Sequence, residues 1–454
     1  MAEPRTVAAR LVALVEHVTG EPVPLRLRAW DGSEAGDPSA PVLVLKDRRA
    51  LRRLLWSPNE LGLGRAYVAG EITVDGDLYS ALDRVSELVR QLNSRERSME
   101  PGARREILRT LISLRAVGPA PTPPAEESKL SGTKHSVGRD RAAISHHYDV
   151  GNDFYRLVLG ESMVYSCAYW TSAEPGYRLE HAQRDKLDLI CRKLALEPDM
   201  RILDVGCGWG SLVLHAAQNY GVNAIGITLS REQAEYARAR VSDAGLDKRV
   251  EIRVQDYRHI DDGPFDAIAS IGMAEHVGLE RFAEYSASMY RLLRSGGRLL
   301  NHQIAALHPG ADGAAPSGTG IARWRSVRPP RSFIDAYVFP DGQLVPLGTT
   351  AGLLEEAGFE VRDVEALREH YNKTLRAWVA NLDADWDRAV ELTSPGRARV
   401  WRLYMAGSAL SFEQARLGVN QILAVKAKAT GESLMPPVRA FVAGGPRDED
   451  TPAG

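Results

Sequence analysis

The feature that most constrains this chain is an apolar run that ends in closely spaced glycines and leads into a helical pattern. Residues 201–205 (Arg-Ile-Leu-Asp-Val) have the composition of a buried strand, and Gly206, Gly208 and Gly210 follow directly. Small residues at such a turn let a ligand approach the backbone, and the next helix presents its N–H groups there. The segment therefore predicts a nucleotide-like site at the carboxyl end of a strand.

Alternating apolar runs and helical patterns continue over a large part of the chain, from about residue 140 to residue 440. This texture is typical of an α/β domain with a largely parallel sheet. We expect further strands at four places, namely residues 224–228, 250–254, 267–270 and 298–301.

The remaining segments predict the domain boundaries. Residues 1–117 are expected to form a smaller, mainly α N-terminal domain. Residues 118–134 contain four prolines and are expected to be a flexible linker. The catalytic domain is expected over residues 135–440, followed by a disordered tail at 441–454.

Composition excludes several classes of protein. Hydrophobic residues make up 44% and charged residues 26% of the chain, as in ordinary globular proteins, and the net charge of −2 argues against nucleic acid as the main partner. No apolar run is long enough to span a bilayer, and no export signal is apparent. Three cysteines without paired spacing, Cys167, Cys191 and Cys207, favour a reducing compartment, so we expect a cytoplasmic protein.

The glycine spacing separates two kinds of nucleotide site. Dinucleotide binding requires G-x-G-x-x-G and an acidic residue about 20 positions later. Here the pattern is G-x-G-x-G, Asp204 precedes it, and Thr228 stands at the end of the second strand. This arrangement matches the loop of class I S-adenosylmethionine methyltransferases.

Two further residues have both a cofactor role and a structural alternative. Asp256, after the strand at 250–254, is placed to accept a hydrogen bond from an adenine amine or to cap a helix. Gln233 is placed to bond a ribose, with helix capping by Ser230 as the structural alternative.

Five longer segments accompany the loop. They are 147–155 (HYDVGNDFY), 165–170 (YSCAYW), 272–278 (GMAEHVG), 301–304 (NHQI) and 370–378 (HYNKTLRAW). In this order they closely resemble the cyclopropane fatty acid and mycolic acid cyclopropane synthases, over roughly residues 140–425. The stretch 305–328, rich in Gly, Ala and Pro, is longer than the family pattern.

The resemblance implies a Rossmann-like class I methyltransferase domain with a mostly parallel seven-stranded sheet. It implies methyl transfer from S-adenosylmethionine to the cis double bond of an unsaturated phospholipid acyl chain, with bound bicarbonate taking the proton that allows ring closure. The implied catalytic residues are Cys167, Glu275, His302, Ile304 and Tyr371. The implied cofactor-binding residues are Tyr165, Ser166, Asp204, Gly206, Gly208, Gly210, Thr228, Gln233, Asp256 and Tyr257.

Chemistry supports this assignment because methylation of an alkene creates a carbocation. Such a site must exclude water, face the cation with aromatic rings and place a base beside the new methyl group. Taken singly, Cys167, His302 and Tyr371 are more often buried packing residues. Glu275 and His276 suggest a metal pair, but no third ligand has suitable spacing, so we expect no metal.

Alternative functions remain at this point. A related enzyme class makes 10-methylene acyl chains from the same cation, and Glu275 and His302 favour ring closure instead. A small-molecule or sterol C-methyltransferase would not need a bicarbonate site. A non-catalytic lipid-binding protein would not need the set formed by Glu275, His302 and Tyr371.

The expected partner is unsaturated phospholipid at the inner face of the membrane, reached without a transmembrane span. Residues 102–117 form a basic amphipathic pattern that either lies on an anionic surface or packs within its own domain through Leu108, Leu111 and Ile112. The N-terminal domain is expected to serve lipid docking or the formation of a homodimer.

Overall fold

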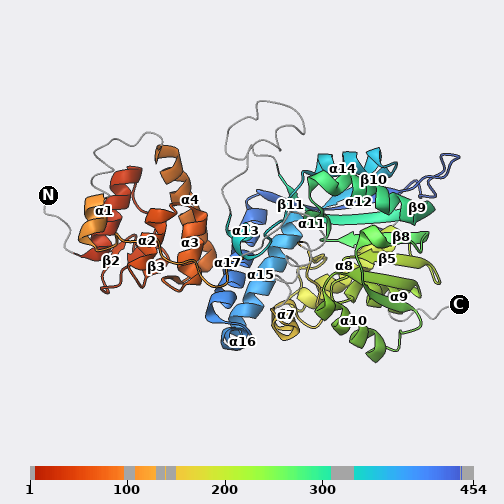
Figure 1. The fold of residues 1–454 in the computed structure, drawn as a ribbon, viewed down its shortest axis with the longest axis horizontal. Helices are drawn as coiled ribbons and strands as arrows, with labels where there is room; N and C mark the ends of the chain where they lie inside the picture. Colours follow the sequence, from red (N-terminus) through yellow and green to blue (C-terminus); the bar gives the residue numbers. More distant parts are fainter. Residues whose placement is uncertain are drawn as a thin grey trace. The chain divides into compact units, whose positions relative to one another are not determined.

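The computed structural model describes most of the chain, namely residues 6–96, 108–128, 139, 150–307, 332–439 and 441. It contains two compact units (Figure 1). Unit 1 consists of Met1–Lys129, Pro329–Pro340 and Trp386–Leu410. Unit 2 consists of Leu130–Arg328, Asp341–Asp385 and Ser411–Gly454.

The expected catalytic range 135–440 is thus interrupted twice by segments that belong to unit 1. The first carries helix α13 (Phe333–Tyr337), and the Phe333 ring packs on Gly64, where an added Cβ would lie 2.4 Å from that ring. The second carries most of helix α17 (Pro395–Glu413), from which Arg402 donates to the hydroxyl of Tyr67 (3.3 Å). The sequence analysis assigned both segments to the catalytic domain because no local pattern indicates the unit on which a helix packs.

Unit 1 is built around a small four-stranded sheet that the expectation of a mainly α domain did not include. Its strands run in the order β2-β1-β3-β4. They are short, and β1 lies within an alternation of buried residues, Val23, Leu25, Leu27 and Ala29, that the sequence analysis did not use. The elements are α1 (Val7–Thr19), β1 (Arg26–Arg28), β2 (Glu34–Gly36), β3 (Val42–Leu45), α2 (Arg49–Trp56), α3 (Glu60–Val68), β4 (Ile72–Asp75), α4 (Leu78–Glu96) and α16 (Trp386–Leu392).

The segment expected to be a flexible linker, 118–134, is described as far as residue 128, and this part is held against unit 1. Arg53 donates to the carbonyl of Thr122 (2.9 Å). Arg65 pairs with the carboxylate of Glu127 (2.7 Å). Prolines here favour an extended chain, which these side chains then fix along the helices.

Unit 2 contains a seven-stranded sheet in the order β10-β11-β9-β8-β5-β6-β7, which confirms the predicted fold class. β11 runs antiparallel to both of its neighbours, whereas β9, β8, β5, β6 and β7 are parallel. The strands are β5 (Arg201–Val205), β6 (Asn223–Thr228), β7 (Val250–Val254), β8 (Phe265–Ile271), β9 (Leu293–Ala306), β10 (Glu360–Ala366) and β11 (Leu417–Val425).

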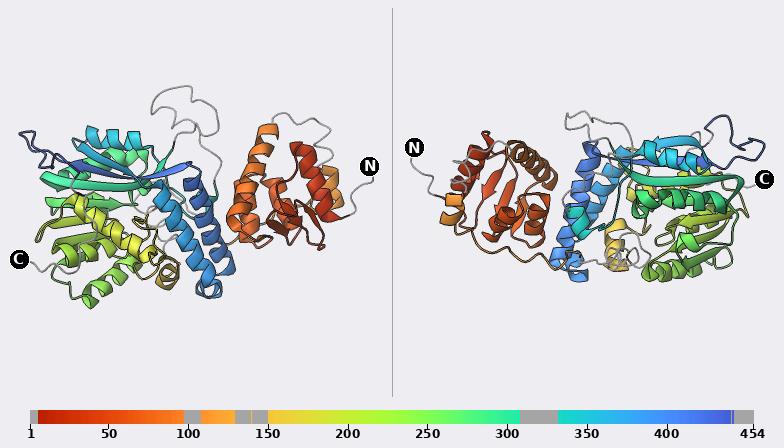
Figure 2. Two further views of the ribbon diagram at one scale, coloured as in Figure 1. Left: turned by 180° about the vertical axis from the view of Figure 1, so that it is seen from behind. Right: turned by 45° about the horizontal axis from the view of Figure 1, so that its top comes forward.

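Helices cover both faces of this sheet (Figures 1 and 2). One apolar cluster joins one sheet face to helices α8, α9 and α10, and a second joins the other face to α12 and α14. The described helices of unit 2 are α7 (Asn152–Leu159), α8 (Leu179–Leu194), α9 (Ser211–Tyr220), α10 (Arg231–Asp243), α11 (Ala274–Val277), α12 (Leu279–Leu292), α14 (Leu347–Glu356) and α15 (Arg368–Ala384). None of the helices described in the chain combines the length and apolar character that crossing a bilayer requires.

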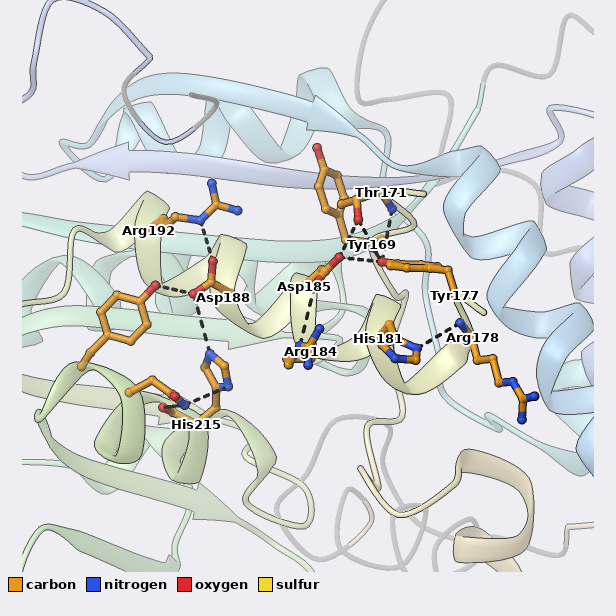
Figure 3. Close-up of polar contacts among 12 residues, drawn as sticks. Tyr169, Thr171, Tyr177, Arg178, His181, Arg184, Asp185, Asp188, Arg192 and His215 are labelled. Carbon is orange, nitrogen blue, oxygen red and sulfur yellow. Dashed lines mark hydrogen bonds and ion pairs between the residues drawn. The ribbon is translucent and has the colours of Figure 1, made fainter. Parts of the chain in front are cut away.

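Helix α8 is held on its outer side by polar contacts (Figure 3). Asp188 pairs with Arg192 (2.7 Å), and Asp185 accepts hydrogen bonds from Tyr177 and Thr171 (2.6 Å each). The opposite side of the helix is buried against the sheet.

Phe441, the first residue of the expected disordered tail, is buried in the core of unit 2. Its carbonyl accepts a hydrogen bond from Arg192 (2.5 Å). The prediction of a disordered tail was therefore wrong at this residue, because its aromatic side chain packs in the apolar core. Residues 442–454 lie outside the described part.

The buried ion pair of unit 1 should be decisive for its stability. Arg53 bonds both carboxylate oxygens of Glu71 (2.8 and 3.1 Å), and both side chains are buried. Glu71→Ala would leave a buried guanidinium without its carboxylate, at a cost of about 3–5 kcal/mol. In urea unfolding, this variant should unfold well before Asp75→Ala, which removes only the exposed Arg28–Asp75 pair (3.0 Å). Equal midpoints for the two variants would contradict this view of the pair.

Candidate functional site

A cleft opens at the carboxyl ends of the parallel strands, with a volume of about 1240 Å³ including its open mouth. All of the predicted cofactor-binding residues except Gly210 line it: Tyr165, Ser166, Asp204, Gly206, Gly208, Thr228, Gln233, Asp256 and Tyr257. Gly210 instead begins α9 in a left-handed conformation (φ 82°), where an added Cβ would lie 3.0 Å from that of Ala237.

The glycine loop approaches the cleft with its backbone. Gly206 has φ 84°, which an L side chain rarely adopts, and an added Cβ would lie 3.2 Å from the Cβ of Met273. The N–H groups of Gly206 and Cys207 both donate to the carbonyl of Ile227 (3.0 and 2.9 Å). Because these two N–H groups already bond β6, they are not available to a ligand. The loop instead lets a ligand come close to its backbone.

Asp204, the last but one residue of β5, offers a carboxylate oxygen to the cleft. The side chain is buried, and its Oδ1 has no hydrogen-bond partner among the described residues. Burial raises the pKa of Asp204 to about 7, and the charge of Lys186 acts in the opposite direction. An unpartnered acceptor in this position fits the ammonium group of an amino-acid-like ligand.

At the end of β6, the two predictions for this segment are compatible: Ser230 caps a helix, and the side chain of Gln233 is still placed at the cleft. Ser230 caps α10 by accepting from the backbone N–H of Gln233 (3.2 Å). The Gln233 side chain accepts from the hydroxyl of Thr228 (2.8 Å) and also lines the cleft.

Asp256 is both a cap and an ion-pair partner. Its Oδ1 accepts from the Arg258 backbone N–H (3.0 Å), and the guanidinium of Arg258 contacts both carboxylate oxygens (2.8 and 2.6 Å). Burial acts to raise the pKa of Asp256, but the bonds from Arg258 outweigh it and the pKa is lowered. An adenine amine would share this carboxylate with Arg258, which the sequence analysis did not foresee.

Glu275 lies at the start of the short helix α11, and its carboxylate turns to strand β9. Oε1 accepts from the backbone N–H of Ile304 (2.7 Å), whereas Oε2 is buried and has no partner among the described residues. Burial raises the pKa of Glu275 to about 7. The structure therefore brings two predicted catalytic residues into direct contact.

Cys167 and Tyr371 both bond the backbone carbonyl of Leu367, which brings the two residues together. The Cys167 thiol and the Tyr371 backbone N–H both donate to the Leu367 carbonyl (3.6 and 3.0 Å). The Leu367 N–H in turn bonds the carbonyl of Val419, which pairs with Ile304 across β11 and β9. Burial raises the pKa of the Cys167 thiol far above its usual value, so this residue contributes no thiolate.

His302 stands two residues before Ile304 on β9 and is buried. Its Nδ1 lies 3.3 Å from Nε2 of Gln421. Burial, together with the charges of Lys186 and Lys193, holds the pKa of His302 well below its usual value, so the imidazole is neutral.

A continuous row of aromatic rings connects the glycine loop to Tyr371, one of the predicted catalytic residues. Trp209 of the loop packs on Tyr155, whose ring contacts Tyr165 (centroids 4.5 and 5.7 Å apart). Trp378 continues the row to Tyr371 (5.3 Å from Tyr165 and 6.1 Å from Tyr371). Aromatic faces of this kind stabilise cationic groups nearby.

Sequence reasoning missed four polar partners of the site, the buried Lys186, Lys193 and Gln421 and the partly buried Arg258. Lys186, Ile190 and Lys193 follow one another at four and three positions, the spacing of residues on one side of a helix, and all three are buried on the inner side of α8. That spacing was the available signal.

Residues 147–149 and 308–328, named in the sequence analysis, lie outside the described residues. Within the described parts, no three His, Cys, Asp or Glu side chains gather as metal ligands.

The strand order with an antiparallel β11, the glycine loop after β5 and the acid after β7 define a class I S-adenosylmethionine-dependent methyltransferase. Residues 135–422 match the model of the mycolic acid cyclopropane synthetase family, and the chain belongs to this family.

Individual relatives extend the comparison. A probable fatty acid methyltransferase of Mycobacterium tuberculosis is 40% identical over 425 residues, which cover 91% of this chain and 93% of the relative. A tuberculostearic acid methyltransferase of the same organism is 32% identical over 412 residues, 89% of this chain and 88% of the relative. The crystal structure of a mycolic acid cyclopropane synthase complexed with SAH and CTAB is 35% identical and superimposes with a TM-score of 0.56, covering 63% of this chain and 97% of that one.

Gly206→Val should weaken S-adenosylmethionine binding more than about tenfold, because the side chain strains the loop and enters the space beside the ligand. Gly245→Val is the matched control, since Gly245 also has a positive φ (65°) but an added Cβ there meets nothing within 4 Å. Calorimetric titration of both folded variants checks this. Wild-type affinity in Gly206→Val would remove the loop from the cofactor site.

Proposed function

We propose that this methyltransferase acts on the cis double bonds of unsaturated acyl chains in membrane phospholipids and produces cyclopropane rings. S-adenosylmethionine, when bound in the cleft, supplies the methyl group. The relatives named as fatty acid methyltransferases support an acyl substrate. The observation that carries the proposal is the unpartnered Oε2 of Glu275, a buried carboxylate whose other oxygen bonds the Ile304 N–H on the strand that also carries His302.

The residues of the chain would protect and orient a cationic intermediate. The rings of Tyr165, Trp378 and Tyr371 form an apolar wall whose faces favour positive charge. Burial of Glu275 and His302 excludes water that would otherwise trap the cation.

The donor set also fits a small oxyanion such as bicarbonate. Glu275 offers an oxygen without a partner, His302 a neutral imidazole and Tyr371 a phenol, and these are the residues that would hold it. Bicarbonate supplies a base for the proton that leaves before ring closure. Cys167 and Ile304 would have a supporting role, because the thiol donates to Leu367 and the Ile304 N–H donates to Glu275.

A second candidate is a 10-methylene or branched-chain product from the same cation. The tuberculostearic acid methyltransferase matches 89% of this chain, whereas the cyclopropane synthase structure covers only 63%. This one relative, which also shares the N-terminal region, supports the alternative. Proton NMR of the acyl chains after incubation with monounsaturated phospholipid distinguishes a ring methylene from an exocyclic alkene or a saturated branch.

Glu275→Gln should lower turnover by about 10²-fold or more, because the amide oxygen remains bonded to the Ile304 N–H and the NH₂ group then presents a donor where the carboxylate presents an acceptor. Since the pKa of Glu275 is raised to about 7 and the ionised form is the acceptor, wild-type kcat should rise as pH increases through about 7. The measurement needs saturating cofactor and a constant bicarbonate concentration. In Glu275→Gln this rise should be absent.

Glu280→Gln, the same change at an exposed residue of α12, is the control and should behave as wild type. Full activity in bicarbonate-depleted buffer, or an unchanged pH profile in Glu275→Gln, would refute the assigned role.

We also propose that unit 1 contacts the phospholipid surface. Leu108 and Ile112 are 48% and 56% exposed and Trp56 is 61% exposed, while Leu111 is buried in the core. Of the three residues named in the packing alternative, Leu111 alone is buried, and it is joined in the core by Leu114 and Ala116. The neighbouring Arg109 is exposed and suits anionic headgroups.

The double variant Leu108→Glu/Ile112→Glu should lose most of its sedimentation with anionic phospholipid vesicles, because it places carboxylates where apolar side chains enter the headgroup region. Val438→Glu, at a 70% exposed residue of unit 2, is the control. If both proteins sediment equally, the lipid surface lies elsewhere.

A further inference from the structure

Three fully buried side chains from three different elements form a row that ends at His302. Lys193 on α8 donates from Nζ to Oε1 of Gln421 on β11 (2.8 Å). Nε2 of the same amide lies 3.3 Å from Nδ1 of His302 on β9. The exposed fractions of Lys193, Gln421 and His302 are 0%, 0% and 2%, so no solvent competes for these bonds.

The chemistry of lysine determines how the amide is turned. An ammonium group has three donors and no acceptor, so the Gln421 atom that faces Lys193 must be the oxygen. The amide NH₂ therefore faces His302 and donates to its Nδ1. A neutral imidazole that accepts at Nδ1 carries its proton on Nε2.

Lys193 is kept in its charged form by two carboxylates. Glu365 lies 2.5 Å and Asp363 3.9 Å from Nζ, and the second carboxylate is also paired with Arg439 (2.7 Å). Burial lowers the pKa of Lys193, and the bond to Glu365 opposes this effect. The amide is thus oriented by a permanent donor.

We propose that Lys193 and Gln421 are positioning residues that hold the His302 proton on Nε2. In this form His302 presents a hydrogen-bond donor at Nε2 and cannot take a proton there. Within the proposed function, on which this role depends, His302 would hold an anionic group in place and would not act as the base.

The tautomer can be measured without turnover. In protein carrying ¹⁵N-labelled histidine, long-range proton–nitrogen correlation spectra distinguish a protonated from an unprotonated ring nitrogen. The chain has 11 histidines, so the His302 signals are assigned by their loss in His302→Asn. We expect Nε2 protonated and Nδ1 unprotonated at neutral pH, and the opposite pattern would overturn the proposal.

Gln421→Glu is the decisive variant because it keeps the shape of the side chain and reverses the role of the atom facing His302. A carboxylate oxygen can only accept, so Nδ1 must become protonated, and turnover should fall at least about tenfold. Affinity for S-adenosylmethionine should stay close to wild type. Lys193→Met provides a second variant, in which the amide loses its orienting donor and the His302 signals should show both tautomers.

Gln303→Glu is the matched control, since Gln303 is also a buried amide and is adjacent to His302, but it bonds Asn301 and Thr350 (2.8 Å each). It should leave the His302 tautomer unchanged. An unchanged tautomer in both Gln421→Glu and Lys193→Met would overturn the proposal. A changed tautomer with undiminished turnover would support the positioning of His302 but refute its role in the proposed function.

Discussion

The site depends on one constraint: the two buried lysines of helix α8, which packs on the sheet, must each have fixed partners. The inner side of α8 carries two lysines with exposed fractions of 2% and 0%, Lys186 and Lys193. An uncompensated buried charge costs several kcal/mol, so each needs fixed partners. Lys186 donates to the Ser166 hydroxyl (2.9 Å), and Lys193 pairs with Glu365. The helix can satisfy both only in one position.

The position of α8 also determines where the residues of the cleft and His302 lie. Lys186 connects α8 to Ser166, which lines the cofactor cleft, and Lys193 connects it through Gln421 to His302. The outer side of the helix is fixed independently by Asp188 and its neighbours (Figure 3). One helix therefore connects the residues that line the cleft to the proposed catalytic residue His302, although neither lysine belongs to a recognisable motif.

How much the sequence could predict follows from the range of the interactions. The glycine loop, Asp204 and the five parallel strands could be predicted because turn, strand and site lie within a few residues, whereas the antiparallel pair β10 and β11 was not predicted from its own residues. The bond between Lys193 and Gln421 joins residues 228 positions apart, and no local pattern indicates it. The pairing of Arg258 with Asp256 is local but depends on how a flexible side chain turns. Strand β1 of unit 1 was missed although Val23, Leu25, Leu27 and Ala29 alternate as buried residues there, because strands of three or four residues give only a short pattern.

The cleft and the catalytic residues share one electrostatic property. Asp204 and Glu275 each keep a carboxylate oxygen without a partner, and burial raises the pKa of both to about 7. Because the folded state then binds more protons than the unfolded state between about pH 4 and 7, stability falls as pH rises through that window. A cation bound beside either group favours its ionised form and offsets this loss. The same unpartnered oxygens that lower the stability of the protein without ligand would therefore favour the binding of a group that supplies a positive charge or a hydrogen-bond donor.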